Sequence, residues 1–204
     1  MKNNVKQCPI TCSLIGIVVL VYIYTTLKYG IEMNVYQGIE AGGFNPILVI
    51  EWKQFYRLIT ANFIHFGLMH IFCNTYSLYN LGMVMERIIG QKKYLLVIVV
   101  SMLSTTVIPL LLYFINGAGY NSIMGGVSGV IFGLIGSLLA LALLYKDVYM
   151  YLFKQIASSV ILMLILSFML PSISLTGHIG GMIGGFVVTW IIEKGDLSKR
   201  RLIN

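Results

Sequence analysis

The sequence predicts an all-α polytopic membrane protein, and three observations lead to that class. Of its 204 residues, 58% are hydrophobic and only 10% are charged, whereas a soluble domain carries about 25% charged residues. The apolar residues gather in six runs, most of them close to the roughly 20 residues that a helix needs to cross a bilayer. The few charges stand mainly in the gaps between these runs. A water-soluble globule is therefore excluded.

Charges, glycines and prolines divide the chain into the expected membrane spans. The first run is about 20 residues long and lacks the small-residue cleavage pattern of a signal peptide, so we expect it to remain as a helix. The connection 30–57 is the one long loop, and its mixed charges and aromatic side chains predict an interfacial structure among lipid headgroups. We expect one membrane domain over 1–204, with spans at about 10–29, 58–85, 94–115, 127–145, 155–171 and 176–192.

The distribution of lysine and arginine predicts the orientation. Cytoplasmic loops of membrane proteins collect these residues. With the N-terminus inside, all of the 14 except Lys28, Lys53 and Arg57 fall on the inner side, and the loops 116–126 and 172–176 carry none. We therefore predict that both termini lie in the cytoplasm. The membrane itself is expected to be a bacterial cell membrane. The net charge of +7 is interpreted as membrane topology, so no nucleic acid partner is expected.

Polar side chains inside spans are costly and are therefore functional candidates. His65, His70 and Asn74 lie in the second span, Ser128 opens the fourth and His178 opens the sixth. No Asp or Glu lies deep within a span, which excludes an aspartyl protease and argues against the acidic relays of pumps. The first two histidines are five residues apart without the Glu of a zinc-protease motif. A three-histidine zinc site would also lack the usual orienting carboxylate, so we expect neither metal nor cofactor.

Ser128 and His178 both begin their spans from the outer side and so share a depth. A serine hydroxyl becomes a nucleophile beside a base, and histidine suits that task near neutral pH. Ser128 also stands where a loop becomes a helix, where backbone N–H groups stabilise developing negative charge. His70 and Asn74 lie at i and i+4 on one helix face and can aim N–H donors at one point. This set predicts a Ser–His dyad with an oxyanion hole.

Small residues supply the packing that would bring the dyad together. Faces with a small residue every fourth position let membrane helices approach closely, and Ser128 and His178 open two such faces. They consist of Gly129, Gly133 and Ser137 in the fourth span and Gly177, Gly181 and Gly185 in the sixth.

Each residue taken alone also has a structural interpretation. Ser128 can bond back to its own helix, His178 can be an interface residue, and Asn74 can hold helices together. His65 lies far around the helix from His70, so we expect it to be a structural or gating residue. The joint presence of these groups at one depth favours the catalytic hypothesis.

Several motifs stand between about Tyr56 and Trp190: Arg57, His65-Phe66-Gly67-Leu68-Met69-His70 with Asn74, Glu86-Arg87, Gly126-Val127-Ser128-Gly129 and Gly177-His178-Ile179-Gly180-Gly181. With these motifs the chain resembles the rhomboid family of intramembrane serine proteases. The resemblance implies a six-helix rhomboid-like bundle in the lipid bilayer that cuts single-pass transmembrane proteins near the outer end of their helix. It implies Ser128 as nucleophile, His178 as base, and His70, Asn74 and the Ser128 N–H as oxyanion-hole donors. Supporting roles are expected for Gly126, Gly129, Phe132, Gly181, His65, Arg57 and Glu86.

Two positions depart from the family pattern. Tyr56 stands where the family usually has Trp, and Phe132 stands where it often has Tyr. Phe132 lies one turn beyond Ser128, so we expect it to stack on the His178 ring without a hydroxyl and activity to survive. One alternative is a non-catalytic relative that binds membrane helices as a chaperone or sorting factor. Another is a small channel or transporter, although the sequence lacks an acidic relay and repeat symmetry.

Overall fold

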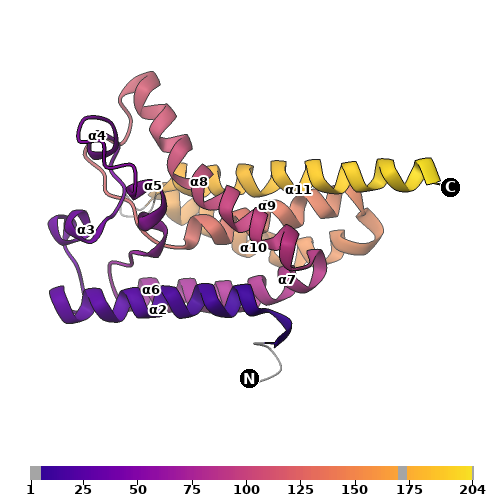
Figure 1. Cartoon of the computed structure of the whole chain (residues 1–204), viewed down its shortest axis with the longest axis horizontal. Helices are drawn as coiled ribbons and strands as arrows, with labels where there is room; N and C mark the ends of the chain where they lie inside the picture. Colours follow the sequence, from indigo (N-terminus) through magenta and orange to yellow (C-terminus); the bar gives the residue numbers. More distant parts are fainter. Residues whose placement is uncertain (1–5, 170–173, 204) are drawn as a thin grey trace.

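The computed structural model describes residues 6–169 and 174–203, and within these ranges the chain is helical without a strand. In Figure 1 the long helices run mostly along the horizontal axis, and the short α3 and α4 lie together at one end. The elements in chain order are α2 (Pro9–Tyr29), α3 (Val35–Ala41), α4 (Pro46–Ile50), α5 (Arg57–Thr60), η1 (Ala61–Phe63), α6 (Leu68–Ser77), η2 (Leu78–Gly82), α7 (Met83–Ile89), α8 (Gln91–Asn116), α9 (Ser128–Leu144), α10 (Lys146–Met169) and α11 (Leu175–Ile203).

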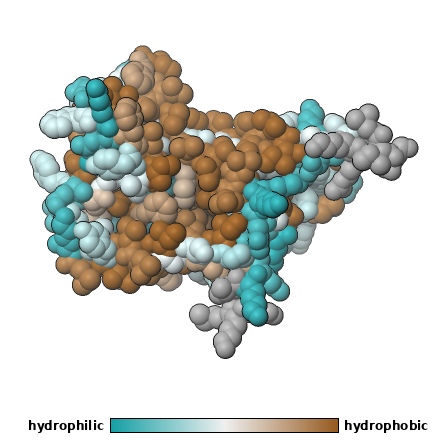
Figure 2. Space-filling view, viewed as in Figure 1, coloured by the Kyte–Doolittle hydropathy of each residue, from teal (hydrophilic) through white to brown (hydrophobic). Residues whose placement is uncertain are grey.

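Several of these helices are built to cross a membrane. Among the described residues, α2, α8, α10 and α11 are long and apolar enough, and α9 is apolar but shorter, at 17 residues. The elements α6, η2 and α7 follow one another without a break. Figure 2 shows apolar surface across the middle of the molecule between two more hydrophilic ends. The predicted helical membrane bundle is confirmed, whereas its six crossings stay a prediction.

The second span differs from its predicted bounds. Its helix was expected at 58 but begins at Leu68, because residues 57–63 form the separate short helices α5 and η1. The backbone is extended at Ile64 and again at Gly67, which interrupts an apolar run that hydropathy alone reads as continuous. His65 therefore lies in the connection before α6, and its predicted place on the span two helix is wrong.

The last two spans also differ from their predicted bounds. The helix α10 begins at Lys146 and α11 continues to Ile203, because both extend through polar residues past the apolar core on which the bounds were based. The predicted end of the fifth span at 171, part of the loop 172–176 and Lys2 lie outside the described residues.

Glycines bring α9 and α11 into backbone contact. A Cβ at Gly181 would overlap the Gly129 carbonyl, and a Cβ at Gly185 would overlap the Gly133 carbonyl. The hydroxyls of Ser137 and Thr189 lie 2.7 Å apart farther along the same interface. The predicted contact between the small-residue faces is therefore present from Gly181 onward, whereas a Cβ at Gly177 would face Met124 and the Thr105 carbonyl rather than α9.

The segment 30–57 is held together by Arg57, which is buried at its end. Its Nη1 donates to the carbonyls of Ile39 and Gly43 at 2.7 Å each, and its Nε donates to Gln54 Oε1 at 2.6 Å. An isolated antiparallel bridge between Phe44 and Met124 joins this segment to the residues that lead into α9. Arg57 therefore supports the loop, and through it the start of α9.

A second buried polar cluster lies where α7 meets the start of α2. The Glu86 carboxylate, 1% exposed, accepts hydrogen bonds from the backbone N–H groups of Ile10 at 3.0 Å and Thr11 at 2.8 Å. It also accepts from the Thr11 hydroxyl at 2.7 Å, which lies 2.9 Å from the Tyr94 hydroxyl. A carboxylate at this position satisfies N–H groups that the first turn of a helix leaves unpaired.

Candidate active site

Ser128 and His178 meet at the contact between α9 and α11. Ser128 is the first residue of α9, and His178 lies near the start of α11. The Ser128 Oγ and the His178 Nε2 are 2.8 Å apart, and the histidine is only 7% exposed. This is the separation of a hydrogen bond between a hydroxyl and an imidazole. The arrangement follows from the glycine contacts, which let the first turns of the two helices approach.

The ring of Phe132 fixes the plane of the His178 imidazole. Phe132 is fully buried one turn beyond Ser128, and the centroids of the two rings are 4.3 Å apart with an interplanar angle of 16°. The stacking expected from the sequence is present. Because the contact is made by the ring face, it does not require the hydroxyl that a tyrosine would add.

The second nitrogen of His178 has a partner that the sequence reasoning missed. The Ser167 Oγ, on α10, lies 2.8 Å from the His178 Nδ1 and also donates to the Met163 carbonyl at 2.7 Å. Ser167 is 4% exposed. The sequence signal was a polar residue in an apolar helix, and no spacing connected it to the other site residues.

A turn that requires glycine leads into Ser128. Gly126 has a φ of +117°, a conformation that residues with a Cβ rarely adopt. The Val127 N–H donates to the His65 Nε2 at 3.4 Å, and the His65 Nδ1 lies 3.2 Å from the Phe63 carbonyl. Because a backbone N–H only donates, the His65 proton stands on Nδ1 and faces that carbonyl. His65 therefore supports the turn. Of the two roles predicted for it, structural or gating, this contact agrees with the structural one.

Two side-chain nitrogens face this turn from α6. A Cβ at Gly126 would lie 2.7 Å from the His70 Nε2 and 3.3 Å from the Asn74 Nδ2. The Phe66 N–H donates to the His70 Nδ1 at 3.4 Å, so the neutral ring carries its proton on Nε2, toward the turn. The Asn74 Nδ2 is buried, and no described residue accepts a hydrogen bond from it. Buried donors without an acceptor are rare, and this one faces the turn that leads into Ser128.

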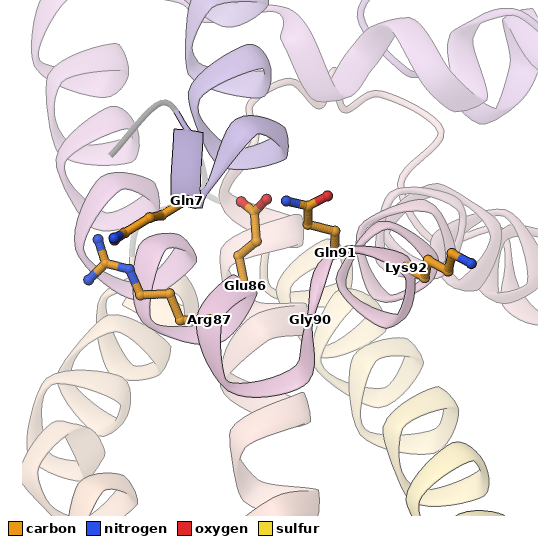
Figure 3. A pocket seen from close by; sticks show the side chains of 6 residues that line it. All are labelled: Gln7, Glu86, Arg87, Gly90, Gln91 and Lys92. Carbon is orange, nitrogen blue, oxygen red and sulfur yellow. The ribbon is translucent and has the colours of Figure 1, made fainter. Parts of the chain in front are cut away.

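Glu86, predicted as a supporting residue, lies elsewhere. It stands at the far end of the α6–η2–α7 run, in an open pocket of about 590 Å³ lined by Gln7, Glu86, Arg87, Gly90, Gln91 and Lys92. Figure 3 shows its carboxylate pointing toward the start of α2 and away from Arg87. The supporting role expected for Glu86 is therefore structural. Its carboxylate binds the start of α2 and not the Ser–His pair.

The described residues include no group of three or more His, Cys, Asp or Glu side chains placed to hold a metal ion. The three histidines have separate partners: a backbone turn for His65, the Phe66 N–H for His70, and two serines for His178. The site is thus built from hydroxyl, imidazole and amide groups.

The family model of the Rhomboid domain matches residues 52–195. The chain belongs to the rhomboid family. Rhomboids are generally intramembrane serine proteases, and the matched range contains every predicted site residue of this rhomboid. Among curated proteins, no sequence matches this rhomboid. The family and the helical membrane fold expected from the sequence are confirmed, while the catalytic role of each residue stays a prediction.

Proposed function

We propose that this rhomboid is an intramembrane serine endopeptidase that cleaves single-pass transmembrane proteins near the outer end of their helix. The observation that carries the proposal is the 2.8 Å contact between the Ser128 Oγ and the His178 Nε2. The unpartnered Asn74 Nδ2 beside the same turn supports it. The contact provides a nucleophile with its base, and the amide provides a donor for an oxyanion.

In the first half of the reaction, the Ser128 Oγ attacks the scissile carbonyl carbon while its proton passes to the His178 Nε2. The carbonyl oxygen becomes an oxyanion, which accepts hydrogen bonds from the Asn74 Nδ2, the His70 Nε2 and the Ser128 backbone N–H. The last group has no acceptor within its own helix, because Ser128 is the first residue of α9. Collapse breaks the C–N bond, and the imidazolium protonates the leaving amine.

In the second half, a water molecule gives a proton to the His178 Nε2 and attacks the acyl-enzyme ester. The resulting tetrahedral intermediate releases the new carboxyl terminus, and the proton returns to the Ser128 Oγ. A peptide bond within a helix is shielded and must first be unwound. Gly or Pro in the substrate lowers that cost by roughly 1 to 3 kcal/mol per residue, so we expect helix-weakening sequences at the cleavage site.

We place both termini of the protein in the cytoplasm of a bacterial cell membrane. The start of α2 and the end of α11 lie toward the same end of the bundle, opposite α3 and α4 (Figure 1). The gaps on the termini side hold most of the lysines and arginines, as cytoplasmic loops do. The Ser–His pair then lies in the outer half of the membrane.

The test uses the purified protein in detergent with a single-pass reporter and a serine-reactive fluorophosphonate probe. We expect the wild-type protein to cleave the reporter and to react with the probe. In Ser128→Ala, the rate of cleavage and the rate of labelling should each fall by at least about 10⁴-fold. The matched control is Ser122→Ala, an exposed serine in the loop before α9, which should retain both.

Equal cleavage by the Ser128→Ala protein would overturn the assignment of the nucleophile. Absence of labelling and cleavage in monodisperse wild type, over several reporters and lipids, would instead favour a non-catalytic rhomboid that binds membrane helices. Site-specific crosslinking of an intact reporter helix would then identify that second function.

A further inference from the structure

We propose that Ser167 is a positioning residue that holds the His178 imidazole in the protonation state of a base. The inference rests on the proposed function, because it concerns the same His178. Ser167 would complete a chain of hydrogen bonds from the Met163 carbonyl through Ser167 and His178 to Ser128. It touches neither the substrate nor the attacking oxygen.

The three contacts fix where the protons stand. The Met163 carbonyl only accepts, so the Ser167 hydroxyl donates its single proton there, over 2.7 Å. Its oxygen can then only accept from the His178 Nδ1, over 2.8 Å. A neutral imidazole carries one proton, so the Nε2 is left as the acceptor that faces the Ser128 hydroxyl, over 2.8 Å. No other placement of protons on a neutral ring makes hydrogen bonds of all three contacts.

The reverse tautomer would disable the pair. With the proton on the Nε2, that nitrogen would donate to the Ser128 Oγ and would have no free electron pair to take up the serine proton. Ser167 would then have to donate to the Nδ1 and abandon the Met163 carbonyl. Both Ser167 and His178 are buried, at 4% and 7% exposed, so the lost hydrogen bond has no ready solvent replacement. Ser167 thus favours the tautomer that accepts a proton from Ser128.

The other catalytic histidine candidate provides an internal contrast. The His70 Nδ1 accepts from the Phe66 N–H, so that ring carries its proton on the Nε2 and donates toward the turn before Ser128. Ser167 sets the opposite tautomer on His178. An oxyanion donor and a general base require these opposite states, and each ring receives the required one from the partner of its Nδ1.

The experiment combines kinetics with ¹⁵N NMR of the imidazole rings in the full-length protein in detergent. The chain has only three histidines, so a His70→Gln sample and a His65→Gln sample suffice to assign His178. In wild type at neutral pH, we expect a neutral His178 ring protonated on the Nδ1. In Ser167→Ala, we expect a mixture that includes the Nε2-protonated ring.

The kinetic readout separates positioning from folding. We expect Ser167→Ala to lower kcat about three- to tenfold, as for loss of one neutral hydrogen bond, and to change KM less than twofold. Ser167→Thr, which keeps the hydroxyl, should restore at least half of the lost kcat. The matched control is Ser159→Ala, an exposed serine on the same helix, which should match wild type in kinetics and NMR.

Wild-type kcat together with an unchanged His178 spectrum in Ser167→Ala would overturn the proposal. If that variant does not give monodisperse protein, the wild-type spectrum decides, and a neutral His178 protonated on the Nε2 overturns it. The NMR result does not depend on turnover. An inactive wild type with an Nδ1-protonated ring would therefore overturn the proposed function while supporting the role of Ser167.

Discussion

Two buried polar clusters of this rhomboid lie at opposite ends of the α6–η2–α7 run, and they are satisfied to different degrees. At the α7 end, the Glu86 carboxylate accepts three hydrogen bonds from the first turn of α2, two of them from backbone N–H groups. At the α6 end, the Asn74 Nδ2 is buried and faces the turn before Ser128 with no acceptor among the described residues. The Glu86 cluster is complete as it stands, whereas the cluster around Ser128 lacks an acceptor.

Under the proposed function, this difference separates a polar group that stabilises the fold from one that serves a reaction. A buried polar group with all partners in place contributes to stability, while an unpartnered donor costs roughly 1 to 3 kcal/mol. An oxyanion that forms during the reaction would accept the hydrogen bond from this donor and so offset the cost. Substitutions in the two clusters should therefore affect different quantities: catalytic rate at the Ser128 end and stability at the Glu86 end.

The sharpest test of this contrast is Asn74→Ala. We expect kcat to fall about 10²- to 10³-fold, because one oxyanion donor is lost. The midpoint of unfolding should stay the same or rise, because the variant removes a buried donor without an acceptor. Reporter cleavage gives the rate, and circular dichroism during heating gives the midpoint.

The matched control for Asn74→Ala is Asn80→Ala, in the same helical run. Asn80 is exposed, and its amide donates to the Tyr76 carbonyl at 2.8 Å. We expect near wild-type kcat from this variant. A clear loss of stability in Asn74→Ala would assign Asn74 to helix packing, the structural interpretation that its sequence context also allows.

Gly181→Ala should affect both quantities at once. The added Cβ would overlap the Gly129 carbonyl and lie 2.9 Å from the Thr105 Oγ1, so α9 and α11 must separate. We expect a loss of about 1 to 3 kcal/mol in stability from overpacking and at least a tenfold loss of cleavage rate as His178 moves from Ser128. Unfolding in a detergent–SDS titration and reporter cleavage measure the two effects.

Gly195→Ala is the control for that substitution, since a Cβ there meets nothing within 4 Å. A Gly181→Ala protein that unfolds earlier but cleaves at the wild-type rate would show that the Ser–His pair does not depend on this helix contact.

Much of this arrangement follows from sequence patterns. Small residues every fourth position predicted the contact between α9 and α11, because backbone approach requires small side chains whatever the surroundings. His70 and Asn74 were predicted to share a helix face from their spacing alone. Both features are local in the sequence, and the structure places them as expected.

The features that the sequence did not reveal depend on contacts between distant elements. Ser167 is one serine in an apolar helix, and only the packing of α10 beside α11 brings it to His178. His65 was placed on a helix because hydropathy does not report the extended residues Ile64 and Gly67. Glu86 was grouped with the active site, although its carboxylate binds the start of α2.

At the satisfied end, Glu86→Gln should lower stability by about 1.5 to 3 kcal/mol, because hydrogen bonds to a charged acceptor are lost and an amide N–H₂ faces backbone donors. The cleavage rate per folded molecule should change less than twofold. The SDS titration gives the stability. Glu51→Gln is the control, since that carboxylate is exposed. A rate loss beyond tenfold with unchanged stability would place Glu86 in the reaction instead.

The smallest expected effect is that of Lys93→Met, at a second polar contact near the α7 end. The Lys93 Nζ lies 2.6 Å from the Glu193 Oε1 and 2.8 Å from the Asp196 Oδ2, and its side chain is 34% exposed. Ion pairs with this access to solvent contribute at most about 1 kcal/mol and are screened by salt. The Tyr145 hydroxyl still donates to the Glu193 Oε2 at 3.0 Å, so the carboxylate keeps a partner after Lys93 is removed.

We therefore expect Lys93→Met to lose less than about 1 kcal/mol of stability in the SDS titration. The loss should shrink as salt is raised, and Lys92→Met is the exposed control. A salt-independent loss of several kcal/mol would mean that the Lys93 ion pairs stabilise the fold as strongly as the buried hydrogen bonds of Glu86.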